Sequence, residues 1–186
     1  GRVVVTPPLH LWHTFQSLVL VYRDAYNSHL NDRYQGKWRE YERLAKWART
    51  SLFDTGVGMV DRPIPRPALP RLSATAGNGA GAMYWAVTTW VTGSGEEGSP
   101  SEAAALAGAP GSVLVVAQSD GAPAGVAGWN VYVGLAPGEW RLQNATPLAP
   151  GAPWVMTEAE LVDGRRPGGG QSPCSYLRPG RVLERW

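Results

Sequence analysis

The sequence of 186 residues contains a single cysteine, Cys174, so an intrachain disulfide is excluded. Long apolar runs are also missing. The longest near the start, residues 18–22, has five residues, whereas a membrane-spanning helix needs about 20. The first residues lack the apolar stretch of a signal peptide and begin with glycine rather than methionine. We therefore expect no disulfide framework, no transmembrane segment and no signal peptide.

Charge is scarce and unevenly distributed. Charged residues make up 17% of the sequence, and the net charge is +2. Residues 1–71 carry a net charge of +5, residues 72–164 carry −7, and residues 165–186 carry +4. Basic ends around an acidic middle can attract nucleic acid or the acidic middle of a neighbouring copy, and we favour the neighbouring copy. Fifteen of the 17 basic residues are arginine, which suits interfacial ion pairs, although GC-rich codon usage explains this equally well.

Residues 9–53 have a helical pattern. They contain no proline and one glycine, Gly36, and their apolar residues recur at steps of three and four. Glycine in a helix costs about 1 kcal/mol relative to alanine. One long helix and two helices divided near Gly36 are therefore both compatible with the sequence.

The pattern changes after this helical region. Residues 62–70 contain four prolines in nine positions, which predicts a stiff, extended linker. Short β-prone runs bounded by turn-forming residues follow, with no helical pattern between them, and this is typical of an antiparallel sandwich. The expected strands are 72–76, 83–92, 101–106, 112–118, 128–133, 140–143 and 154–157.

These observations predict an α+β protein with four parts. They are an N-terminal arm with an amphipathic helix or helical pair (1–58), a proline-rich linker or hinge (59–71), an antiparallel immunoglobulin-like β-sandwich (72–164) and an extended basic C-terminal arm (165–186). The arm is rich in glycine, proline and arginine and ends in Trp186, so we expect it to dock on another surface.

The residues needed for catalysis are not grouped in the sequence. The three histidines, His10, His13 and His29, all lie near the N-terminus, and no Gly-x-Ser-x-Gly elbow or phosphate-binding glycine loop is present. The adjacent acids Glu96 and Glu97 lie in a glycine-rich turn and are expected to be solvated. We expect no catalytic, cofactor or metal site, and hence a protein that is not an enzyme.

Nine tryptophans are the most unusual feature of the composition. Alternation places Trp85 with Met83 and Val87 on one face of a strand, and Trp129 with Val131 on another, as a core or subunit interface requires. The alternative is a platform that stacks on sugars, with Trp140 and Trp154 as the residues to substitute in a test. The candidates for such a platform are Trp85, Trp90, Trp129, Trp140 and Trp154. For the helical aromatics, packing against a neighbouring copy is the leading interpretation, because aromatics and arginine are enriched at interfaces. The residues predicted to form interfaces are Phe15, Tyr22, Tyr26, Trp38, Trp47, Arg178, Arg181 and Trp186.

Two motifs suggest a family. Residues 81–92 (GAMYWAVTTWVT) with 95–101 (GEEGSPS), and residues 124–134 (AGVAGWNVYVG), resemble the paired strand motifs of fibronectin type III-like and immunoglobulin-like modules. The order of the motifs looks permuted, and Trp129 stands where tyrosine is usual. Modules of this order behind a helical segment and a proline-rich hinge resemble those of virion structural proteins of tailed bacteriophages.

The resemblance implies a structural role. It suggests a head-to-tail connector, adaptor or fibre-anchoring component in the neck or tail of the virion, with helices and arms docked on other subunits. The implied partners are copies of this chain and portal, tail or fibre proteins, and direct nucleic-acid binding and a membrane are not expected. The alternative function is a carbohydrate-binding or adhesion module that contacts host glycans through tryptophans.

Overall fold

The computed structural model describes residues 2–29, 32–157, 160–178 and 180. The chain divides into two compact units. The first comprises residues 1–61 and 172–186, and the second comprises residues 62–171. The second unit is therefore an insertion into the first, and the chain passes between them twice. The proline-rich segment and residues 165–171 belong to the inserted unit, so the observed boundaries differ from the linear order that the sequence suggested.

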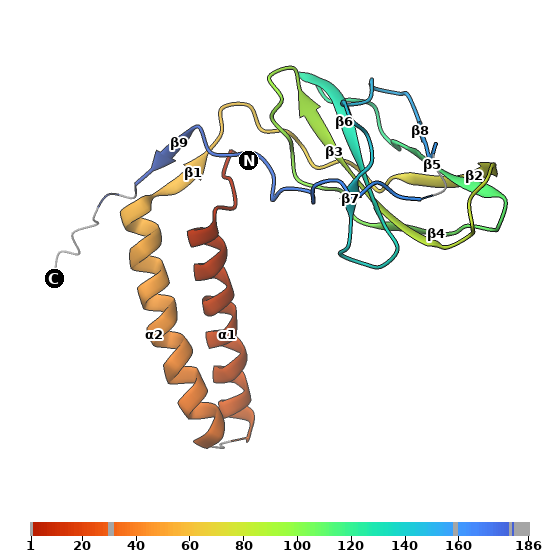
Figure 1. Ribbon diagram of the computed structural model, residues 1–186. Coiled ribbons are helices and arrows are strands. Elements are labelled where there is room, and N and C mark those ends of the chain that lie inside the picture. The colour runs from red at the N-terminus through yellow and green to blue at the C-terminus, as the bar shows by residue number, and fades with distance from the viewer. Residues whose placement is uncertain (1, 30–31, 158–159, 179, 181–186) are drawn as a thin grey trace. The chain divides into compact units, whose positions relative to one another are not determined.

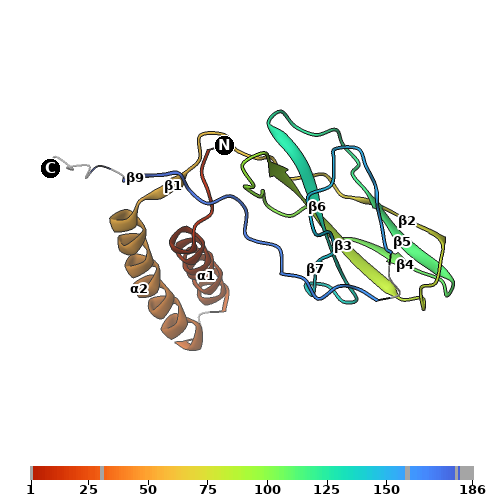
Figure 2. The same ribbon diagram turned by 45° about the horizontal axis from the view of Figure 1, so that its top comes forward.

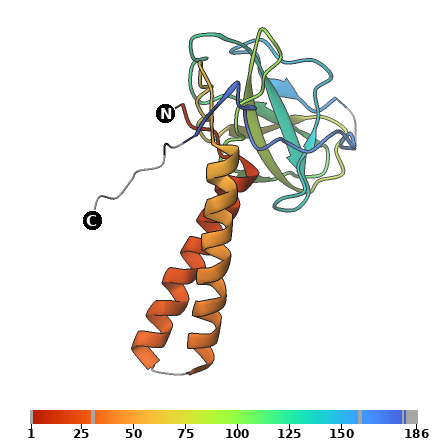
Figure 3. The same ribbon diagram turned by 90° about the vertical axis from the view of Figure 1, so that its left-hand side faces the viewer.

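The first unit contains a hairpin of two helices, α1 (Pro7–His29) and α2 (Asp32–Thr55), which lie side by side (Figures 1 and 3). Thr6 precedes α1, and the first two residues of α1 are prolines. Proline lacks a backbone N–H, but the N–H groups of the first turn have no partner within a helix, so no hydrogen bond is lost. Gly36 lies inside α2 rather than between the helices. Of the two alternatives, the helical pair is confirmed, but with its boundary before Gly36.

A small ribbon closes the open end of the hairpin. Strand β1 (Val57–Met59) pairs antiparallel with β9 (Ser175–Leu177), and Val3 bridges to Met59 on the other side of β1. Gly58 sits at the tightest point, because a Cβ there would lie 2.8 Å from both Pro173 Cγ and Thr6 Cγ2. Part of the predicted C-terminal arm thus forms a strand with its own chain.

The second unit consists of two antiparallel sheets (Figure 2). One has the order β2-β5-β8 and the other the order β4-β3-β6-β7. The strands are β2 (Arg71–Ala76), β3 (Met83–Thr92), β4 (Ala104–Ala107), β5 (Ser112–Ala117), β6 (Val126–Gly134), β7 (Arg141–Leu142) and β8 (Trp154–Val155). Each expected strand is found, with shifts of up to three residues at its ends. The chain is thus an α+β protein with antiparallel sheets.

Both sheets contribute to one hydrophobic core. Trp90 of β3 and Trp129 of β6 are register partners, and both are buried there together with Leu114 of β5. The prediction that Trp129 faces the core is confirmed. Trp85 does not join this core, because β3 turns Tyr84, Ala86 and Trp90 toward it. A place for Trp85 at a subunit interface stays a prediction.

Candidate assembly surface and a half-buried carboxylate cluster

Aromatic side chains fill the seam between the two helices. The Tyr22 and Tyr41 rings stack with their centroids 5.2 Å apart. Phe15 lies 6.4 Å from Tyr41. Tyr26 and Trp38 are 5.9 Å apart, ring centroid to ring centroid. Four of the residues predicted to meet a neighbouring copy, Phe15, Tyr22, Tyr26 and Trp38, therefore pack within their own hairpin, and their contact with another subunit stays a prediction.

The remaining predicted interface residues lie elsewhere. Trp47 lies on α2 and is 58% exposed, although tryptophan is the largest side chain. Arg178 follows β9 and is exposed. Arg181 and Trp186 fall outside the described residues. Trp47 is thus the residue among these that presents a large apolar surface to solvent.

The two helices differ sharply in charge. Residues 7–22 of α1 contain no Asp, Glu, Lys or Arg, and its only such residues are Arg23 and Asp24. Despite this, Leu20 and Val21 are 47% and 61% exposed. By contrast, α2 carries ion pairs along its surface, such as Lys37 to Glu40 at 2.9 Å and Lys46 to Glu42 at 3.8 Å. The surface of α2 is thus charged. The exposed surface of α1 before Arg23 is uncharged, with Leu20 and Val21 beside polar residues such as Gln16 and Ser17.

An apolar hollow lies beside the start of α1. It has a volume of about 300 Å³ and is lined by Val5, Leu9, His10, Trp12 and His13. No acidic or basic residue other than the two histidines lines it. With the exposed residues further along α1, the hollow forms the candidate assembly surface.

The most highly connected polar group belongs to the second unit. Glu97 Oε1 accepts hydrogen bonds from Thr89 Oγ1, from Asn130 Nδ2 at 3.0 Å and from the Tyr132 hydroxyl at 2.5 Å. Arg165 donates to Glu97 Oε2 at 2.5 Å and lies 5.8 Å from the centroid of the Tyr132 ring. The prediction that this turn carboxylate is solvated is wrong, because two neighbouring strands supply donors that the sequence does not show to be close.

These contacts set the ionisation of the cluster. Partial burial by itself raises the pKa of the Glu97 carboxyl, but the hydrogen bonds from Thr89, Tyr132, Asn130 and Arg165 outweigh it and hold the pKa below the ordinary 4.5. Burial and the Glu97 carboxylate raise the pKa of the Tyr132 hydroxyl well above 10.0. The hydrogen bond to Glu97 raises the pKa of Arg165. Glu97 is therefore a carboxylate held charged, which suits a structural ion pair rather than a proton donor.

The Arg165 contact holds an extended segment, residues 162–171, which we call the strap. Its backbone is fixed at Val162, whose N–H donates to Gln143 Oε1 at 2.9 Å, and at Arg165, whose carbonyl accepts from Leu142 N at 2.9 Å. At its end, Gln171 Oε1 accepts from Ile64 N at 2.6 Å. This part of the predicted basic arm is thus bound to its own unit.

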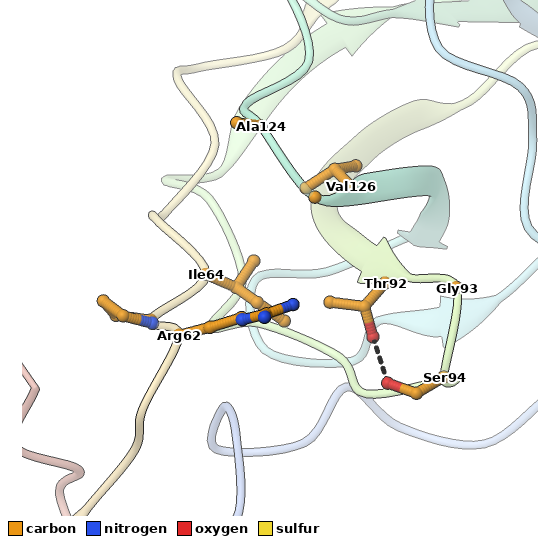
Figure 4. Close-up of a pocket in the computed structure, with 9 residues that line it drawn as sticks. Arg62, Ile64, Thr92, Gly93, Ser94, Ala124 and Val126 are labelled. Atoms are coloured by element: carbon orange, nitrogen blue, oxygen red, sulfur yellow. Dashed lines mark hydrogen bonds between the residues drawn. The ribbon is translucent and has the colours of Figure 1, made fainter.

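A second hollow of about 300 Å³ lies at one end of the second unit (Figure 4). Arg62, Ile64 and Val126 line it together with Thr92 and Ser94, whose hydroxyls are hydrogen-bonded at 2.9 Å. Its lining includes no carboxylate, histidine or thiol. The side chains around it thus supply no general base or activated nucleophile.

The tryptophans of the second unit leave little surface for sugar stacking. Trp90 and Trp129 are fully buried, and Trp85, Trp140 and Trp154 are half-buried. Trp154 packs against the core. A stacking platform needs an open ring face, so it would have to use the half-buried Trp85, Trp140 or Trp154.

Comparisons with known proteins give no assignment. No protein-family model matches the chain, no curated protein matches it, and no solved structure matches it. Within the described residues, no group of three or more His, Cys, Asp or Glu side chains is placed to hold a metal ion. In the same part of the chain, neither helix is long and apolar enough to cross a membrane.

Proposed function

We propose that this chain is a non-enzymatic structural protein that assembles through its helical hairpin, as a connector, adaptor or fibre-anchoring component in the neck or tail of a tailed bacteriophage. The observation that carries the assembly role is the uncharged first two-thirds of α1 combined with its exposed apolar residues, Leu20 and Val21. A partner that covers this uncharged stretch would bury both apolar side chains without desolvating a charge.

The inserted unit fits a decorating module in this proposal. Its two antiparallel sheets share one core, and its strand motifs resemble those of immunoglobulin-like and fibronectin type III-like modules. We propose that it is a sandwich of this type with permuted strand order. In this proposal the hairpin and its ribbon anchor the chain to the particle. The partners are copies of the chain and portal, tail or fibre proteins.

The virion role is tested on particles. Tailed particles released by cells that encode this chain are purified on a density gradient, and the chain is quantified by mass spectrometry against a major capsid protein. We expect a fixed copy number per particle that survives a high-salt wash. A chain that is recovered only in the fractions free of particles would contradict the proposal.

A further inference from the structure

Two features of the first unit are complementary in shape and chemistry. Trp47 projects from α2 with 58% of its surface exposed, and the hollow beside α1 is lined by Val5, Leu9 and Trp12. The volume of about 300 Å³ is at the lower end of ligand pockets, which hold about 300–1,000 Å³. It therefore suits a single large side chain better than an extended ligand.

The hollow does not hold the tryptophan of its own chain. Trp47 is absent from its lining, and the two features lie on different helices of the hairpin. An occupant that supplies an exposed apolar ring must come from another molecule. A second copy of this chain offers such a ring in Trp47.

The charges near both features also fit. The hollow lies in the stretch of α1 without Asp, Glu, Lys or Arg, so a charged occupant would lose hydration without gaining a partner. Next to Trp47, Lys46 is already paired with Glu42, 3.8 Å away. Arg43, one helical turn before Trp47, is exposed and long enough to keep its charge in water at the rim of the contact. Tryptophan is also the residue type most often found to dominate interface energies.

We infer that Trp47 of one copy inserts into the hollow formed by Val5, Leu9 and Trp12 of the next copy. This inference rests on the proposed assembly function and names the partner at the α1 surface. Each copy carries both a Trp47 and a hollow. A reciprocal exchange of Trp47 closes a two-fold dimer, whereas a one-way contact gives a ring or an open chain.

The contact is tested by pairwise cross-linking in the full chain with Cys174→Ser. One preparation carries Thr50→Cys, one turn after Trp47, and a second carries His13→Cys, at the lining of the hollow, and both are treated with a short bismaleimide, alone and mixed. Both replaced residues are exposed, so Trp47 and the apolar lining stay intact, and we expect cross-linked dimers in the mixture. The matched control adds Trp47→Ala to both preparations, which should abolish the cross-link. A cross-link of equal yield in this control would overturn the inference.

Light scattering supplies an independent measurement. Over a tenfold range of concentration, Trp47→Ala should reduce the mass-average to that of the monomer, whereas Phe53→Ala should leave it within error of the parent. Leu9→Glu, which places a charge in the hollow, should act like Trp47→Ala with an unchanged far-ultraviolet circular dichroism spectrum. A parent chain that is monomeric throughout would overturn this contact, while the particle measurement decides the proposed function separately. An oligomer that Trp47→Ala does not weaken would also overturn the contact but leave self-assembly standing.

Discussion

Glu97 and Arg165 are 68 positions apart in the chain and form an ion pair with a separation of 2.5 Å. The Glu97 side chain is only 14% exposed, whereas that of Arg165 is 54% exposed. The pair fixes the strap to the sheet that contains β3 and β6. Because the acid is held by four donors, a single change in this cluster should destabilise the second unit.

Glu97→Gln should destabilise the second unit. The glutamine amide turns one acceptor into a donor that faces Asn130 or Arg165, and the charge-assisted hydrogen bonds are lost. Hydrogen bonds to charged groups contribute about 1.5–3 kcal/mol each, so we expect a loss of about 2–3 kcal/mol in the free energy of unfolding. Urea unfolding followed by tryptophan fluorescence measures it. Glu96→Gln in the same turn is the control, and an equal loss there would contradict the prediction.

The same cluster predicts that the stability of the second unit depends on pH in the acid range. Its hydrogen bonds hold the folded-state pKa of Glu97 below the ordinary 4.5, so this stabilisation is fully present above that pH. It is lost as the pH falls below 4.5 and through the lower folded-state value. We expect the urea midpoint of the parent to drop more steeply between pH 5 and pH 3 than that of Glu97→Gln. Parallel curves for the two proteins would show that the carboxylate does not titrate as proposed.

Tyr132 predicts that the second unit also loses stability at alkaline pH. Its folded-state pKa lies above 10.0, so the folded state favours the neutral hydroxyl, and this contribution decreases as the pH rises above 10.0. Tyr132→Phe should remove this alkaline loss of stability. It should also lower the free energy of unfolding at neutral pH by about 1–2 kcal/mol, since one donor to Glu97 is lost. Thermal unfolding at pH 8 and pH 10.5 separates the two effects. Tyr176→Phe, on the exposed strand β9, is the matched control.

The end of the strap depends on Gln171. Its side chain accepts from Ile64 N at 2.6 Å and donates to the Arg62 carbonyl at 3.1 Å. Gln171→Ala should loosen the strap and speed trypsin cleavage after Arg165 several-fold, because cleavage needs local opening. Mass spectrometry of a time course identifies the cut. Ser172→Ala should leave the rate unchanged, and no difference between the two variants would contradict this role.

Two glycines in the first unit should respond oppositely to alanine. Nothing lies within 4 Å of a Cβ at Gly36, so Gly36→Ala should stabilise α2 by about 0.5–1 kcal/mol. At Gly58 the added Cβ meets Pro173 and Thr6 at 2.8 Å, so Gly58→Ala should cost about 1–3 kcal/mol through overpacking. Thermal unfolding of the two variants checks both signs, and a stabilising Gly58→Ala would show that the ribbon is looser than described.

Local pattern determined most of the elements. The steps of three and four in residues 9–53 and the alternation in residues 83–92 and 128–133 marked the helices and the central strands, because these periods place apolar side chains on one face. Local pattern did not locate the break between the helices. Gly36 was the candidate, but an isolated glycine costs only about 1 kcal/mol, and the packing of α1 on α2 offsets it.

Only the tertiary structure decided what the long-range contacts are. The sequence shows a turn with two acids and a distant arginine, yet Glu97 becomes a half-buried ion-pair partner because β3, β6 and the strap meet there. Likewise, the sequence predicts an extended arm at Ser175–Leu177. In the structure this segment forms a strand, because it pairs with β1. Such pairings depend on loop closure over tens of residues, which no local period encodes. The sequence by itself determined the helices, the strands and the uncharged stretch of α1. Only the fold decided that one unit is inserted into the other. It also decided which helical aromatics pack inside the hairpin and that Trp47 stays exposed.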